Sequence, residues 1–113
     1  MISEEQVYNF VSEMDEGRRL YSNPSGFCFF LKLDDKALDR VRTNPRLLTN
    51  PLLIKDLLFQ SGDNIHFIGA YGKGFQVIRY AIRDVAIKEK AKSVSWCNKD
   101  MTKFIYRRIK CPQ

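Results

Sequence analysis

A glycine-rich segment in the middle of the chain is the part of the sequence best suited to bind a ligand. It reads Gly69-Ala70-Tyr71-Gly72-Lys73-Gly74-Phe75 and stands between a run that predicts a strand and a run that predicts a helix. At the start of a helix the unpaired backbone N–H groups carry partial positive charge, and glycine lets an anion approach the backbone closely. The segment therefore predicts a site for a phosphate or another anion.

Positive charge is concentrated in the same half of the chain. The 113 residues carry a formal net charge of +6. Residues 1–60 hold 8 Lys and Arg against 9 Asp and Glu, whereas residues 61–113 hold 11 against 4, a net of +7. Such a charge attracts phosphorylated cofactors, nucleic acid or acidic membrane surfaces. A solvated basic surface without a dedicated partner is the plainer interpretation of the same pattern.

Few other residues offer catalytic or metal chemistry. Cys28, Cys97 and Cys111 are far apart, and His66 is the single histidine, so neither a disulfide framework nor a zinc site is predicted. His66 lies in the middle of a predicted strand, where an interior histidine is more common than a catalytic base. Cys97 ends a predicted strand and is interpreted as a small buried hydrophobe rather than a nucleophile.

Hydrophobic periodicity embeds the glycine-rich segment in alternating helices and strands. The predicted elements are, in order, helix 4–16, strand 27–33, helix 34–43, helix 51–60, strand 65–70, helix 75–90, strand 93–97 and helix 99–109. Two strands bridged by a helix almost always run parallel, so residues 64–97 predict a parallel strand, glycine loop, helix and strand unit. Residues 1–113 are thus predicted to form a single α/β (α+β) domain with a small mixed sheet.

Two familiar phosphate-binding motifs do not fit the segment. A Walker motif needs Ser or Thr after its Gly-Lys pair, and Gly74 follows Lys73 here. The Rossmann fingerprint is Gly-x-Gly-x-x-Gly, whereas the order in this chain is Gly-x-x-Gly-x-Gly. Nucleoside-triphosphate enzymes and dinucleotide enzymes are therefore disfavoured.

Together with the helix and strand that follow, the segment resembles the GNAT family of acyl-coenzyme A N-acyltransferases. In that family a loop written Arg/Gln-x-x-Gly-x-Gly/Ala binds the pyrophosphate of acyl-coenzyme A through backbone N–H groups. Its two glycines fall on Gly72 and Gly74, and Gly69 stands in the place of the Arg or Gln. The resemblance covers about residues 64–111. It implies that Gly72, Lys73, Gly74 and Phe75 bind acetyl-coenzyme A or another acyl-coenzyme A, with no metal.

The same resemblance implies a catalytic acid and an amine acceptor. The family tends to carry a tyrosine on the short helix after the strand, where it protonates the departing coenzyme thiolate. Tyr106 takes that position, although packing on the last helix is the plainer interpretation of this aromatic residue. Compared with the family, the chain is shortened at both ends, so a homo-oligomer in which another copy supplies the missing strands is a further expectation.

Two other functions stay open alongside acyl transfer. One is a non-catalytic structural or interaction protein that retains the fold. The other is nucleic-acid binding, because Ile68–Phe75 also looks like the Ile-Gly-x-x-Gly loop of KH domains, which clamps a nucleic-acid backbone. That loop joins two helices, whereas the residues before it in this chain predict a strand.

The sequence also predicts where the protein works. The start, Met1-Ile2-Ser3-Glu4-Glu5, lacks the basic and then apolar pattern of a signal peptide. No apolar run approaches the roughly 18 residues that a membrane span needs. A cytoplasmic protein without membrane attachment is the expectation.

Overall fold

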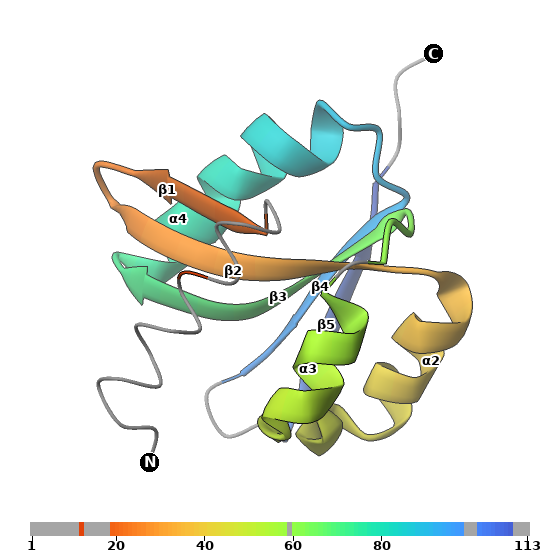
Figure 1. Cartoon of the computed structure of the whole chain (residues 1–113). Helices are drawn as coiled ribbons and strands as arrows, with labels where there is room; N and C mark the ends of the chain where they lie inside the picture. The colour runs from red at the N-terminus through yellow and green to blue at the C-terminus, as the bar shows by residue number, and fades with distance from the viewer. Residues whose placement is uncertain (1–11, 13–18, 59, 99–101, 110–113) are drawn as a thin grey trace.

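The computed structural model describes residues 12, 19–58, 60–98 and 102–109. Its strands are β1 (Leu20–Asn23), β2 (Gly26–Leu33), β3 (Asn64–Gly72), β4 (Ser93–Cys97) and β5 (Phe104–Arg108). They form one five-stranded sheet in the order β1-β2-β3-β4-β5 (Figure 1). Neighbouring strands are antiparallel except β3 and β4, which run parallel.

Helices cover both faces of this sheet. They are α2 (Asp35–Thr43), the 3-10 helix η1 (Pro45–Thr49), α3 (Pro51–Leu57), α4 (Gly74–Ala81) and the π-helix η2 (Ile82–Ile87). Helices α2 and α3 pack on one face, and α4 packs on the other, which gives three layers (Figure 1). The predicted α/β class and the parallel unit of strand, glycine segment, helix and strand are confirmed.

Strand β2 forms the centre of the core because both of its faces are covered. Phe29, Leu31 and Leu33 point toward the layer of α2 and α3, whereas Cys28 and Phe30 point toward α4. All five side chains are buried. Alternate residues of a strand point to opposite faces, so a continuous apolar run is the pattern that a doubly covered strand requires. The predicted strand 27–33 is confirmed.

Local capping signals set the two helices that follow β2. The Asp34 carboxylate accepts a hydrogen bond from the Ala37 N–H at 2.7 Å and begins α2, which ends before the Asn44-Pro45 pair. The Asn50 side chain accepts from the Leu52 N–H at 3.0 Å, with proline at the first position of α3. Both predicted helices are therefore confirmed, although α3 ends at Leu57 rather than near Gln60.

The predicted last helix, residues 99–109, is wrong, because residues 104–108 form strand β5. The Asn98 side chain accepts hydrogen bonds from the N–H groups of Thr102 (2.9 Å) and Lys103 (3.0 Å), which turns the chain back on itself. The returning residues pair antiparallel with β4. Phe104 and Tyr106 then pack on the α2 face of the sheet, as alternate residues of a strand do.

Two further elements differ from the prediction. Strand β1 is absent from the predicted elements. It pairs antiparallel with β2 as a hairpin. The helix after the glycine segment is an α-helix as far as Ala81 (α4) and a π-helix from there to Ile87 (η2). It therefore ends before the predicted Lys90. The predicted helix 4–16 lies outside the described residues apart from position 12, which is helical.

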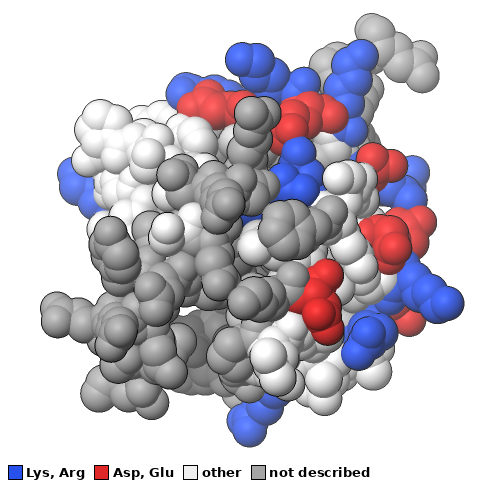
Figure 2. Space-filling model, in the orientation of Figure 1, with Lys and Arg blue, Asp and Glu red and all other residues white. Residues whose placement is uncertain are grey.

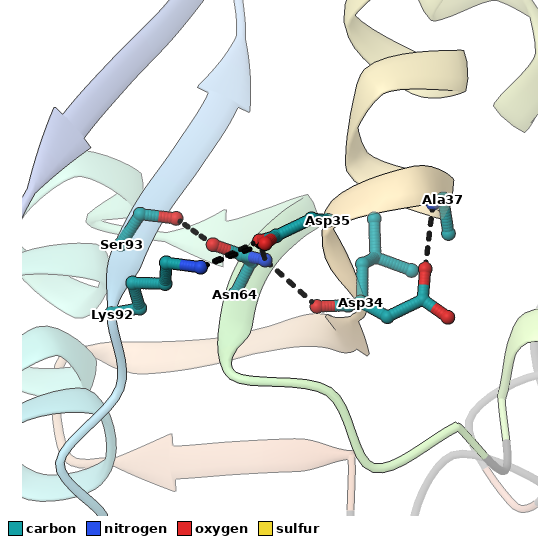
Figure 3. A network of polar contacts seen from close by, with 7 residues as sticks. Asp34, Asp35, Ala37, Asn64, Lys92 and Ser93 are labelled. Carbon is teal, nitrogen blue, oxygen red and sulfur yellow. Dashed lines mark hydrogen bonds and ion pairs between the residues drawn. The ribbon is translucent and has the colours of Figure 1, made fainter.

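A partly buried polar network fixes the start of the parallel pair (Figure 3). The Asn64 side chain donates to the Leu33 carbonyl at 3.1 Å and to the Asp35 carboxylate at 2.9 Å, and it accepts from the Ser93 hydroxyl at 2.7 Å. Lys92 also pairs with Asp35 at 2.8 Å. Because an unpaired buried amide is costly, these contacts specify how β3, β4 and the start of α2 meet.

Lys90 ends the helical segment in an unfavourable conformation, with a φ of 59°. Glycine adopts this left-handed region without the Cβ penalty, so Lys90→Gly is expected to raise the free energy of unfolding by about 1 kcal/mol. Urea unfolding measures the change. The matched control is Lys88→Gly, because Lys88 is right-handed helical (φ −63°) and glycine there should cost about 1 kcal/mol. A loss of stability in both variants would contradict the expectation.

Candidate functional site

The glycine-rich segment continues strand β3 as far as Gly72 and enters α4 after one residue, Lys73. Gly72 has a φ of 86°, which side-chain-bearing residues rarely adopt. A Cβ at this position would lie 2.5 Å from the Ser25 carbonyl oxygen, and the Lys73 N–H donates to the same oxygen at 2.9 Å. The segment therefore packs against the β1–β2 turn. This contact alone requires glycine at position 72, whether or not a ligand binds.

This conformation corrects the KH-type interpretation of the segment. Ile68–Gly72 belongs to β3 and pairs with β2, whereas the KH loop joins two helices. The Ile-Gly-x-x-Gly pattern is therefore part of a strand here. It offers no such loop to a nucleic-acid backbone.

The start of α4 has the features of an anion site. The Lys73 carbonyl accepts from the N–H groups of Gln76 (2.8 Å) and Val77 (3.2 Å), and no side chain caps the helix. The N–H groups of Gly74 and Phe75 precede these bonds at the amino end, where helical N–H groups lack an intrahelical acceptor. The structure thus brings the four predicted binding residues, Gly72 to Phe75, to one helix terminus.

Strands β3 and β4 diverge before the chain reaches this terminus (Figure 1). They pair only between Asn64–Phe67 and Ser93–Trp96, whereas β3 continues to Gly72. Within the described residues, the β4-facing edge of β3 has no strand partner beyond Phe67. The register with β2 also shifts here, with Ile68 as the extra residue of β3, and such bulges leave backbone groups outside the regular ladder.

Exposed basic side chains lie on the face of the sheet that α4 covers, next to the glycine segment. On the face seen in Figure 2, Lys and Arg side chains lie beside Asp and Glu side chains at the top and right of the view. Helix α4 lies on the other face of the sheet, where Lys73 before α4, Arg79 on α4 and Arg83 on η2 are exposed. The glycine segment therefore borders a face with basic side chains.

Tyr106, the predicted catalytic acid, lies on β5 instead of a helix. It pairs with Ser95 and faces the α2 layer, where the Arg42 guanidinium lies 5.3 Å from the centre of its ring. Ser95 in turn pairs with His66, and Gly72 is roughly 20 Å farther along β3 at the usual rise of a strand. The structure therefore does not bring Tyr106 beside the glycine segment, and its catalytic role stays a prediction.

His66 and Ser95 form a buried polar pair that the sequence prediction did not include. The His66 Nδ1 and the Ser95 hydroxyl are 2.8 Å apart, and the Phe104 ring stacks on the imidazole with a centroid distance of 5.4 Å. Burial lowers the pKa of His66 to about 4, so it is neutral near pH 7. Because both side chains are buried, the pair is suited to holding β3 against β4 rather than to attacking a substrate.

The cysteines that the structure describes are not activated nucleophiles. Burial raises the pKa of the Cys28 thiol to about 12 and also raises the pKa of Cys97. Both groups are therefore thiols at neutral pH, and the thiolate is the reactive form. In the described part of the chain, no cluster of three or more His, Cys, Asp or Glu residues is arranged to bind a metal.

Among the described residues, none of the helices is both apolar enough and long enough to cross a bilayer. Comparisons of the chain with protein-family models, with curated proteins and with solved structures gave no match.

Proposed function

We propose that the chain binds acyl-coenzyme A, with the pyrophosphate at the amino end of α4. The observation that supports this most is that β3 continues beyond its pairing with β4, which ends at Phe67, as far as the amino end of α4. A helix terminus attracts the phosphates through its N–H groups and its dipole. Lys73, which is exposed beside that terminus, adds a positive charge.

The edge of β3 suits the remainder of such a ligand. The pantetheine arm of coenzyme A is an extended chain with two amides, and extended amides bind well along a strand edge. The residues of β3 beyond Phe67 offer backbone N–H and C=O groups on the side that β4 has left. One continuous stretch of the chain, from Ile68 to Phe75, thus offers backbone groups to both parts of the coenzyme. The helix terminus suits its phosphates, and the edge of β3 suits the amides of its pantetheine arm.

Acyl transfer to an amine is the second step of the proposal. The amine nitrogen attacks the thioester carbonyl, a C–N bond forms and the C–S bond breaks. The coenzyme leaves as a thiolate that takes a proton, for which Tyr106 is the candidate implied by the family resemblance. The described residues at the end of β3 and the start of α4 include no carboxylate or histidine to deprotonate the amine. This observation favours the alternative of a non-catalytic structural or interaction protein that retains the fold.

Calorimetry with acetyl-coenzyme A tests the binding step. We expect Lys73→Gln to weaken binding about fivefold, because an exposed charge contact contributes about 1 kcal/mol. Lys36→Gln is the matched control, since Lys36 is an exposed lysine on α2, across the sheet. Pantetheine, which lacks the phosphates, should give no measurable heat. The absence of heat with millimolar acetyl-coenzyme A would contradict the proposal.

Thiol release in the presence of a panel of amines separates transfer from binding. If Tyr106 is the acid, Tyr106→Phe lowers the rate of thiol release and leaves the affinity for acetyl-coenzyme A unchanged. Binding without thiol release from any amine supports the non-catalytic alternative.

The mass of the protein in solution tests the expected oligomer, which a strictly monomeric mass would contradict.

A further inference from the structure

The outer face of α4 is a surface that the core does not use. Val77, Ile78 and Ala81 point into the core, which leaves the opposite side of the helix to solvent. There a shallow hollow of about 280 Å³ is lined by Gln76, Arg79, Tyr80 and Arg83. Their spacing of three and four residues places these side chains on one face of the helix.

This face combines cations with aromatic rings. The Phe75 side chain is 67% exposed and that of Tyr80 is 40% exposed, which is high for aromatic residues. The Arg83 guanidinium lies 4.9 Å from the centre of the Tyr80 ring, so a cation and a ring are presented together. Arg79 lies beside them and is exposed.

Negative charge is scarce around these groups. Between Asp63 and Asp84 the sequence contains no acidic residue. The Asp84 carboxylate accepts from the Tyr21 hydroxyl at 2.5 Å and from the Arg83 Nε at 2.9 Å. These contacts hold the pKa of Asp84 below its usual range, with the Arg83 hydrogen bond as the main cause, and they direct the carboxylate toward groups of the protein. The face is therefore complementary to an anionic partner.

We propose that this face, formed by Phe75, Gln76, Arg79, Tyr80 and Arg83, binds single-stranded nucleic acid. Arginine side chains contact the phosphates, while unpaired bases stack on exposed aromatic rings and on guanidinium planes. An acidic peptide would use the cations but would provide no base to stack on the exposed parts of the Phe75 and Tyr80 rings. The two proposals share Phe75, but the residues tested below, Arg79 and Tyr80, lie outside the edge of β3 and the amino end of α4.

Fluorescence anisotropy tests the proposal on the full chain without coenzyme. The probe is a labelled single strand of about 12 nucleotides, a length within the range of known single-strand binding sites. We expect binding at low salt that weakens as salt is raised. Tyr80→Leu should weaken binding about tenfold through the loss of base stacking. Arg79→Gln should lower the slope of log affinity against log salt by about 0.7, the value for one phosphate contact on a single strand.

Arg40→Gln is the matched control, because Arg40 is an exposed arginine on α2, on the opposite side of the sheet. It removes the same charge and should leave binding unchanged. Equal losses in Arg40→Gln and Arg79→Gln would show that only net charge matters and would overturn the proposal. Equal displacement of the oligonucleotide by polyglutamate would overturn it as well, as would no anisotropy change at low salt. Each of these results is independent of whether acetyl-coenzyme A binds.

Discussion

Gly72→Ala is expected to lower the free energy of unfolding by about 2–4 kcal/mol, which combines the cost of a left-handed backbone with that of overpacking. The added methyl would lie 2.5 Å from the Ser25 carbonyl oxygen, which belongs to the backbone and has little room to move. The φ of 86° adds strain for any residue with a side chain. Urea unfolding, followed by circular dichroism, measures the change.

Gly69→Ala is the matched control three residues earlier in the same strand. The atoms nearest to its added methyl are ring carbons of Tyr71 at 3.4 Å and of Phe29 at 3.6 Å, which are ordinary contact distances. We expect a change within about 1 kcal/mol, as for a well-tolerated core substitution. If the two variants were equally unstable, the contact between Gly72 and the β1–β2 turn would not be the cause.

The stability of the protein is expected to rise by about 3 kcal/mol between pH 4 and pH 7 because of His66. Burial lowers the pKa of His66 to about 4 in the folded state, whereas an unfolded histidine has a pKa near 6.5. Below pH 6.5 the unfolded chain therefore binds a proton that the folded chain rejects. The loss develops as the pH falls from 6.5 to about 4 and then levels off, and urea unfolding across this range measures it.

The change in stability between pH 4 and pH 6.5 is assigned to His66, because it is the single histidine of the chain. The pKa values of Asp35 and Asp84 are lowered from 3.8, so the stability that they contribute is lost only at lower pH. His66→Asn keeps an amide near the position of Nδ1, where Ser95 can still bond, and removes the titration. We expect this variant to be less stable throughout but to lose the pH 4–6.5 slope. An unchanged slope would contradict the assignment.

The parts of the fold that the sequence predicts well are those with local signals. Asp34 and Pro51 mark helix starts within a few residues of the elements that they begin, and the run 27–33 is apolar enough to require cover on both faces. The anion-site geometry was predictable for the same reason. The glycines, the strand before them and the helix after them are neighbours in sequence, so the order alone places Gly72 at a helix terminus.

The elements that sequence reasoning missed depend on distant partners. Met101, Phe104, Ile105 and Ile109 have helical spacing, but Phe104 and Tyr106 also alternate, and pairing with β4 makes residues 104–108 a strand. The pair formed by His66 and Ser95 joins residues 29 positions apart. The sequence pattern that could have predicted this pair is the alternation of Ser93 and Ser95 in an otherwise apolar strand, because it indicates polar partners on a neighbouring strand.

The short parallel contact between β3 and β4 divides the sheet into two antiparallel pieces, β1–β2–β3 and β4–β5. Only four residues of each strand join these pieces, and the buried network around Asn64 secures one end of the joint. The angle between the β4–β5 hairpin and β3 is thus determined by contacts that lie far from Gly72. Substitutions in the hairpin can therefore change its angle to β3 while the glycine segment keeps its place on the β1–β2 turn. The β4–β5 hairpin and the glycine segment are then able to evolve separately in this fold.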